Sequence, residues 1–226
     1  MKIVSWNLAG GDKRAPLGAF DCDIAALQER RYADVDDREL WVGHRPRRGL
    51  SVRVAAGWSV ERIDVPRRMP RYFVPAQVSG PESFQMISVW AQPDRPYRYV
   101  RGTVRAVERW AKRITAQPTV IAGDFNANAC WDGQHPSDRN FTALAARLSE
   151  LGLVSAYHAF FNEEYACETR PTFFLYRHTD RPFHLDYCFI PRTWLPRLRS
   201  VTVGAHEEWG KWSDHMPVSV ELASLA

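Results

Sequence analysis

Short runs of alternating apolar and polar residues recur along the whole chain. Residues 218–222 and 201–203 both alternate with a period of two, the pattern of strands that bury one face. Together with short, mostly apolar runs elsewhere, this pattern predicts strands over residues 2–6, 24–28, 50–55, 58–63, 72–78, 84–91, 119–122, 171–175, 184–190, 201–204 and 217–222.

Two segments have helical periodicity instead. Between residues 100 and 114, apolar residues recur every three or four positions, and arginines recur every four positions on another face. A second helix is expected over residues 140–151, with Gly152 as its C-cap. The arginine-bearing face is more often solvated than bound to DNA in such helices. Many strands with few helices favour an α+β fold, and we expect one domain over residues 1–226.

Composition narrows the class of protein. The chain has 226 residues, 45% hydrophobic and 25% charged, which are globular values that exclude disordered, collagen and coiled-coil proteins. Apolar runs are far shorter than the ~20 residues of a membrane span, and the N-terminus turns polar too soon for a signal peptide. The four cysteines form no CxxC pair, which excludes a zinc ribbon or thioredoxin-type site. We expect a cytoplasmic monomer with reduced thiols and no membrane partner.

Charge bears on the partner. Thirty basic residues against 26 acidic ones give a net charge of +4 and a pI near 9.0, and nearly all the basic residues are arginines. The planar guanidinium suits phosphate groups, so a polyanionic partner such as nucleic acid is favoured. A GC-rich genome explains the same arginine excess equally well.

Candidate chemistry lies at the ends of the predicted strands. A carboxylate that ends a strand is usually a turn residue, but here five strand ends carry oxygen ligands or imidazole. Hard oxygen ligands without a Cys/His cluster indicate Mg²⁺ or Mn²⁺ instead of zinc. The residues are Asn7, Glu29, Asp124 with Asn126, Asp186, and Asp214 with His215.

The segments around these residues resemble, in order, the successive motifs of the endonuclease/exonuclease/phosphatase superfamily, which includes deoxyribonuclease I and the abasic-site endonucleases. Each motif alone is weak, whereas the ordered set is specific. The resemblance implies a four-layer α/β sandwich, in which two mainly antiparallel sheets pack face to face with helices outside. The segments are Ser5-Trp6-Asn7, Leu27-Gln28-Glu29, Gly123-Asp124-Phe125-Asn126, Leu185-Asp186-Tyr187 and Ser213-Asp214-His215-Met216-Pro217.

The resemblance also implies a metal site at one edge of the sandwich. Glu29 is its leading ligand, with Asn7 and Asp214 beside or just behind it. Relatives of the abasic-endonuclease type carry an acidic residue two positions after the asparagine, where this chain has Ala9. We therefore expect a single site for Mg²⁺ or Mn²⁺, centred on Glu29.

By the same resemblance, four residues are catalytic. Asp124 and Asn126 align or deprotonate the attacking water, and His215 contacts the scissile phosphate while Asp186 holds its imidazole. In-line attack on a phosphodiester adds negative charge to the phosphoryl oxygens, which a divalent cation and an imidazolium stabilise. Whether Asp124 or the His215–Asp186 pair is the general base stays open.

Candidate substrate contacts flank these residues. Trp90 lies where relatives place a catalytic His or a phosphate-contacting Tyr, and it either stacks on a base or sugar or packs in the core. Arg177, His178 and Arg181 precede Asp186 in a loop that borders the substrate groove in the family, and we expect them to bind flanking phosphates. The sequence gives weaker support for phosphate binding by a second basic loop, residues 45–48.

Three functions compete. We expect a metal-dependent phosphodiesterase, specifically a nuclease that hydrolyses nucleic-acid phosphodiester bonds through activated water. The alternative is a phosphatase of the same fold that acts on a small phosphorylated molecule or a phosphoinositide. A catalytically dead binding module is disfavoured because six residues of the motifs are intact, namely Glu29, Asp124, Asn126, Asp186, Asp214 and His215.

Overall fold

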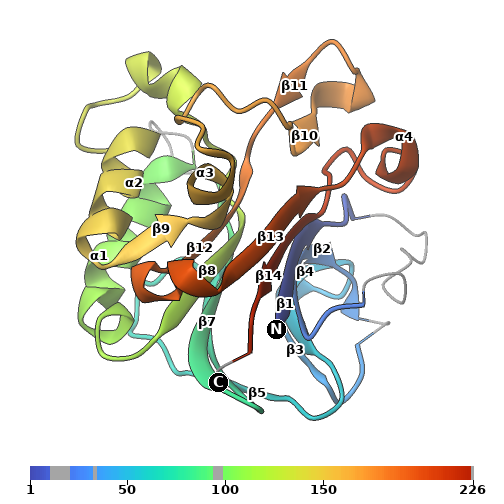
Figure 1. Cartoon of the computed structure of the whole chain (residues 1–226), viewed down its shortest axis with the longest axis vertical. Coiled ribbons are helices and arrows are strands. Elements are labelled where there is room, and N and C mark those ends of the chain that lie inside the picture. The colour runs from blue at the N-terminus through green and yellow to red at the C-terminus, as the bar shows by residue number, and fades with distance from the viewer. Residues whose placement is uncertain (11–20, 33–34, 94–98, 225–226) are drawn as a thin grey trace.

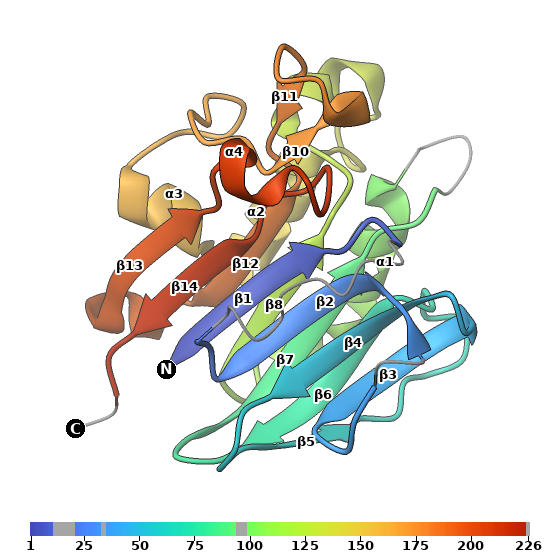
Figure 2. The same cartoon turned by 90° about the vertical axis from the view of Figure 1, so that its right-hand side faces the viewer.

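Two six-stranded sheets pack face to face in the computed structural model, which describes residues 1–10, 21–32, 35–93 and 99–224 (Figures 1 and 2). The first sheet has the strand order β13-β14-β1-β2-β4-β3. Its strands are β1 (Lys2–Asn7), β2 (Ile24–Arg30), β3 (Glu39–Arg45), β4 (Arg48–Val54), β13 (Leu198–Val203) and β14 (Val218–Leu222).

The second sheet has the order β5-β6-β7-β8-β12-β9. Each sheet contains one parallel pair near its centre, β1 with β2 and β7 with β8, and its other pairs are antiparallel. The strands are β5 (Ser59–Arg62), β6 (Phe73–Ser79), β7 (Ser83–Trp90), β8 (Thr119–Asp124), β9 (Leu153–Ser155) and β12 (Asp186–Pro191). A small hairpin of β10 (Phe173–Phe174) and β11 (Pro182–Phe183) stands apart.

Helices cover the outside of the sandwich. The apolar faces of α1 (Val100–Ile114) and α2 (Phe141–Glu150) pack on the outer face of the second sheet (Figure 1). The Asn140 side chain accepts a hydrogen bond from the Ala143 amide and begins α2, and Gly152 follows its end with a φ of 81°. The described helices also include α3 (Ala156–Phe161), α4 (His206–Trp209) and short 3₁₀ turns at Ala129–Gln134, Leu175–Arg177 and Arg192–Arg197.

The core between the sheets is aliphatic. The inward-facing residues of β1, β2 and β4 meet those of β7 and β8, with Ile3, Ile24, Val52, Met86 and Ala122 all at most 1% exposed. Burial of such side chains contributes roughly 1.5–3 kcal/mol each to folding, which makes this core the main source of stability. On the outer face of the first sheet, Trp6 and Trp209 of α4 pack edge to face, 5.2 Å between ring centroids.

The predicted fold class is confirmed, with differences at the periphery. The structure adds β3, an edge strand, and α3, which Ser155 caps by accepting a hydrogen bond from the His158 amide. The strand expected over residues 171–175 is only the two-residue β10. All four cysteines are free thiols. Among the described residues, no helix has the length and apolar character needed to cross a bilayer.

Candidate active site

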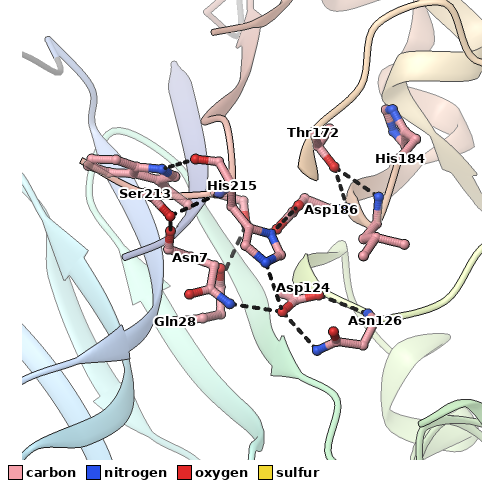
Figure 3. Close-up of polar contacts among 12 residues, drawn as sticks. Asn7, Gln28, Asp124, Asn126, Thr172, His184, Asp186, Ser213 and His215 are labelled. Carbon is pink, nitrogen blue, oxygen red and sulfur yellow. Dashed lines mark hydrogen bonds and ion pairs between the residues drawn. The ribbon is translucent and has the colours of Figure 1, made fainter. Parts of the chain in front are cut away.

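Five chain segments converge at one edge of the sandwich. The parallel register of β1 and β2 places Asn7 opposite Gln28, next to Glu29. The antiparallel register of β8 and β12 places Asp124 directly opposite Asp186. The segment that precedes β14 carries His215 to the same edge (Figure 3). The site is therefore shared between the two sheets.

A buried pair links the sheets. His215 donates a hydrogen bond from Nδ1 to Asp186 Oδ2 at 2.8 Å, and the Trp6 indole donates to the His215 carbonyl at 2.8 Å. The Thr172 hydroxyl accepts from the Asp186 amide at 3.0 Å. His215 and Asp186 are 5% and 0% exposed. The bond from Nδ1 orients the imidazole so that Nε2 faces the site, where it lies 4.0 Å from Asp124 Oδ2.

Two asparagines hold the Asp124 carboxylate. Asn7 Nδ2 and Asn126 Nδ2 donate to Oδ2 at 2.9 and 2.8 Å. The backbone N–H of Asn126 donates to Oδ1 at 2.8 Å. Asn126 Nδ2 also donates to the Ala91 carbonyl at 3.2 Å. Figure 3 shows the contacts that Asn7 and Asn126 make with Asp124. This network fixes the orientation of Asp124 and places the Asn126 amide group beside it.

Glu29 is the extra residue of a β-bulge. Gln28 pairs with Leu50 and Arg30 with Gly49, so Glu29 has no partner on β4, and its φ is 56°. A bulge re-aims one side chain out of the regular alternation, and here the Glu29 carboxylate faces the site. Its Oε2 lies 2.9 Å from Arg48 Nη2.

Burial and charge shift the proton affinities of three of these groups. Burial raises the pKa of Glu29, and Arg48 partly offsets the effect. Burial raises the pKa of Asp124 to about 7, against the opposing charge of His215. For His215 burial acts to lower the pKa, but the carboxylates of Asp186 and Asp124 outweigh it and raise the pKa to about 10. The site thus favours an imidazolium beside a carboxyl group that titrates near neutrality.

These residues line a cleft of about 350 Å³. The structure brings together all seven residues predicted as catalytic or metal-binding: Asp186 lies behind His215, and the others form the wall of the cleft. The lining comprises Asn7, Ala9, Glu29, Arg48, Trp90, Ala91, Gln92, Pro93, Tyr99, Asp124, Asn126, Phe173, Asp214 and His215.

The predicted substrate-binding residues lie in two places. Trp90 borders the cleft but is only 8% exposed, because it packs against Tyr72, with 4.7 Å between ring centroids. Arg177, His178 and Arg181 are exposed in the loop between β10 and β11, outside the lining of the cleft. Arg177 donates to the Gly210 carbonyl at 2.6 Å, so this guanidinium already holds a protein contact.

The structure also reveals residues whose importance the sequence did not indicate. Arg48 belongs to the basic loop of residues 45–48, for which the sequence offers only weak support as a phosphate-binding loop. In the structure it ion-pairs with Glu29 in the cleft. Phe173 packs against His215 with 4.6 Å between ring centroids and the ring planes inclined by 43°. Gly10 lies against the Arg48 side chain, so close that an added Cβ would come within 2.8 Å of Arg48 Nε. Only the three-dimensional arrangement shows these contacts, because no motif surrounds them.

The donor set suits a hard divalent cation. Glu29 and Asp214 offer carboxylate oxygens to the cleft and Asn7 offers an amide oxygen, the ligands that Mg²⁺ and Mn²⁺ take. Asp186 Oδ1 is buried without a hydrogen-bond partner among the described residues. One oxygen or nitrogen atom each of Asp124, Asp186 and His215 also lies within 4.8 Å of the others. His215 Nδ1 is already bound to Asp186, so the cluster around Glu29 is the better fit for the ion.

Other proteins of known structure share the fold. An AP endonuclease from Archaeoglobus fulgidus superposes with a TM-score of 0.74 at 16% identity, covering 98% of this chain and 99% of that chain. The 3′ phosphatase NExo from Neisseria, solved with a product DNA hairpin, has a TM-score of 0.72 at 20% identity, covering 99% of each chain. A humanized TDP2 from D. rerio has a TM-score of 0.69 at 14% identity, covering 99% of this chain and 98% of that chain.

At these identities the structural similarity establishes the fold alone. No curated protein sequence gave a significant match. The sequence model of the endonuclease/exonuclease/phosphatase family, in contrast, matches residues 4–215, a span that contains every residue of the cleft described above. The chain belongs to the Endonuclease/Exonuclease/phosphatase family, whose members are phosphoric-ester hydrolases.

Proposed function

We propose that this protein is a Mg²⁺- or Mn²⁺-dependent phosphodiesterase that hydrolyses nucleic acid by in-line attack of water. The observation that carries the proposal is the pair of groups at the base of the cleft. The Asp124 carboxylate and His215 Nε2 lie 4.0 Å apart, and each is oriented by its own hydrogen bonds. The Asp124 carboxylate can accept a proton from an attacking water, and His215 Nε2 can donate a hydrogen bond to a phosphoryl oxygen.

Glu29, Asn7 and Asp214 would hold the metal ion, since they present hard oxygen donors to the same cleft. Such an ion supplies positive charge that stabilises the phosphoryl oxygens as negative charge builds on them. The burial of Glu29 supports this assignment, because it raises the pKa of the carboxyl group even with Arg48 beside it and thereby favours a further cation next to the carboxylate.

The other residues position and transfer protons. Asp124 Oδ1 or Oδ2 accepts a proton from the attacking water. The side chain of Asn126, which is hydrogen-bonded to Asp124, aligns that water. His215 donates from Nε2 to a phosphoryl oxygen, while Asp186 keeps the imidazole protonated and oriented. We assign the general base to Asp124 because His215, with a pKa near 10, is already protonated at neutral pH.

A nucleic-acid substrate is supported by charge and by the relatives. The chain carries a net charge of +4, and structural neighbours include AP endonucleases and an enzyme solved with a DNA product. Trp90, His178 and Arg181 remain the proposed contacts to bases and flanking phosphates, whereas Arg177 already donates to the Gly210 carbonyl. The alternative, hydrolysis of a small phosphomonoester, has support from the neighbour described as a 3′ phosphatase.

A substrate panel tests the proposal. With Mn²⁺ present, we expect cleavage of plasmid, single-stranded DNA, RNA or abasic duplex, and no comparable hydrolysis of a small phosphomonoester. Asp124→Asn serves as the control for contaminating nuclease, because it removes the proposed base while keeping its shape. Hydrolysis of the phosphomonoester with every nucleic acid intact would establish the alternative. Equal activity in Asp124→Asn would refute the assignment of the base.

A further inference from the structure

A second hollow, of about 440 Å³, opens beside the catalytic cleft and has a different character. It lies where the first residue of β6 and the last residues of β7 meet the start of α1. Tyr72, Trp90 and Tyr99 supply aromatic rings to its wall, and Gly102 and Thr103 belong to the first turns of α1. Ligand sites are commonly hollows of this size with apolar and aromatic linings.

The hollow is continuous with the catalytic cleft. Residues 90–93 and Tyr99 line both. Trp90 is the register partner of Asp124 in the parallel pair β7–β8, and the Ala91 amide donates to the Asp124 carbonyl at 2.8 Å. A group seated in the hollow therefore adjoins the cleft that holds the catalytic carboxylate.

The chemistry of the wall favours a flat ring. Tyr72 and Trp90 lie 4.7 Å apart with their planes inclined by 42°, so they form a fixed aromatic surface, not two independent side chains. Gln92 at the rim carries an amide, and its Nε2 contacts the Trp90 and Ala91 carbonyls only at 3.5 and 3.4 Å. An amide at the edge of an aromatic pocket suits the hydrogen-bonding edge of a nucleobase.

Tyr99 is held in an unusual conformation at this place. It precedes α1 with a φ of 61° and gives the helix no side-chain cap. A non-glycine residue with a positive φ is rare and persists where its surroundings enforce it. Here the conformation places Tyr99 in the walls of both the hollow and the cleft.

We propose that this aromatic hollow is a nucleobase subsite, which binds the base of a nucleotide adjoining the scissile phosphate. The inference rests on the proposed phosphodiesterase function and adds to it a preference for substrates with a base at that position. Stacking on aromatic side chains is sequence-tolerant, because every base has a π-face. The subsite thus recognises a nucleotide without specifying which one.

Paired trinucleotides test the subsite. One carries bases throughout, and the others replace the nucleotide on either side of the cleaved bond with a base-free tetrahydrofuran analogue. We expect KM to be roughly 5- to 150-fold lower when the base is present on the side that adjoins the hollow. Binding of the same trinucleotides in EDTA, where metal-dependent hydrolysis stops, is measured alongside.

Gly102 offers a variant that fills the hollow. A Cβ built at Gly102 meets no atom within 4 Å, so a larger side chain fits without displacing the backbone. Gly102→Trp should bring the KM ratio of base-bearing to base-free substrates close to one. Gly133→Trp is the matched control, because Gly133 is equally open and lies outside the hollow. Tyr99→Gly, which suits the left-handed backbone, removes one wall and should reduce the same ratio.

The outcomes separate the two proposals. If wild-type enzyme hydrolyses no trinucleotide but still binds the base-bearing one more tightly in EDTA, the phosphodiesterase proposal fails and the subsite stands. If neither Gly102→Trp nor Tyr99→Gly changes the ratio, the subsite is refuted. If a hexyl ester in place of the base-bearing unit binds equally well and is equally affected by Gly102→Trp, the hollow is a generic apolar site and the nucleobase assignment is wrong.

Discussion

Glu29 and Asn126 have backbone φ angles of 56° and 48°, a region that L-amino acids other than Asn and Asp rarely occupy. Both side chains face the catalytic cleft. For Glu29, which is neither Asn nor Asp, such a conformation costs of order 1–3 kcal/mol and is retained where function or packing requires it. The motif could be read from the sequence, whereas the bulge that turns Glu29 toward the cleft could not, because it depends on the register between β2 and β4.

The proton affinities at the cleft predict a bell-shaped pH profile. We expect kcat/KM to rise as pH increases through about 7, where Asp124 loses its proton, and to fall through about 10, where His215 loses its proton. A cation bound beside Asp124 favours the carboxylate and moves the lower limb to lower pH. In Asp186→Asn the upper limb should move down, since the carboxylate that raises the His215 pKa is gone, and turnover should fall roughly 10³–10⁴-fold. An unmoved upper limb in that variant would exclude His215 as the group responsible.

The same shifts bear on stability in the absence of metal. The pKa of Asp124 is raised from 3.8, so the stability that its protonated form contributes is lost as pH rises through about 7. The pKa of His215 is raised from 6.5, so its contribution is complete below that pH and lost as pH rises through about 10. Urea unfolding at several pH values in EDTA should therefore show one continuous decline in stability, in which Asp124 acts up to about pH 7 and His215 from there to about pH 10. Asp186→Asn should make the part above pH 7 smaller, because the Asp186 carboxylate is the largest of the charges that raise the His215 pKa.

Arg48 is expected to compete with the metal for Glu29. The two side chains lie 2.9 Å apart, and Arg48 is 59% exposed, so the ion pair is worth only about 0.2–1 kcal/mol. Arg48→Ala should tighten Mn²⁺ binding by roughly 1.5- to 5-fold, measured by calorimetry. Arg47→Ala, an exposed position in the same hairpin, should leave the affinity unchanged. Weaker binding in Arg48→Ala would mean instead that Arg48 holds Glu29 in place.

At the scale of elements, the central strands and the two long helices were predictable because their burial patterns are clean. β8 is buried at every position, and α1 buries Val104, Val107 and Trp110 on one face. β3 was missed because, as an edge strand, most of its residues are only half-buried or exposed, which blurs the alternation. The strand predicted over residues 171–175 is shorter in the structure, where only β10 (Phe173–Phe174) is a strand, since tertiary contacts such as the bond from the Phe174 amide to the Asp214 carbonyl take its place.

The loop between β10 and β11 gives a prediction of its own, because its two arginines have different surroundings. Arg177 is bound to the Gly210 carbonyl, whereas Arg181 is exposed and is our remaining candidate for a flanking phosphate. On duplex DNA, Arg181→Ala should reduce the slope of log K against log salt by about 0.9, the loss of one phosphate contact. Arg177→Ala should leave that slope unchanged and lower stability by about 1 kcal/mol. A reduced slope in Arg177→Ala would show that this guanidinium leaves Gly210 for a phosphate.

At the scale of the whole molecule, the site depends on both sheets at once. Asn7, Glu29 and His215 belong to the first sheet and its flanking loop, and Asp124 and Asp186 belong to the second. The site was predictable as a set of residues because each motif ends or begins a strand, and strand ends gather at one edge. Its closing contacts, such as Asn7 to Asp124 at 2.9 Å, depend on how the sheets pack and could not be read from the chain.

Because the proposed metal ligands come together only in the folded chain, metal binding should stabilise the fold. A ligand that binds only the folded state at 100 times its Kd adds about 2.7 kcal/mol, which for a chain of this length raises Tm by roughly 5–10 °C. We expect that shift on titration with Mn²⁺ and its reversal by EDTA, measured by differential scanning calorimetry. Glu29→Gln keeps the shape of the side chain but removes its charge, and should lose most of the shift while retaining a wild-type Tm, or a slightly higher one, in EDTA. The Tm in EDTA separates a metal ligand from a structural residue. If Glu29→Gln has a lower Tm than the wild type in EDTA, Glu29 is needed for folding. If its Tm in EDTA is unchanged and Mn²⁺ no longer raises it, Glu29 is the residue that holds the ion.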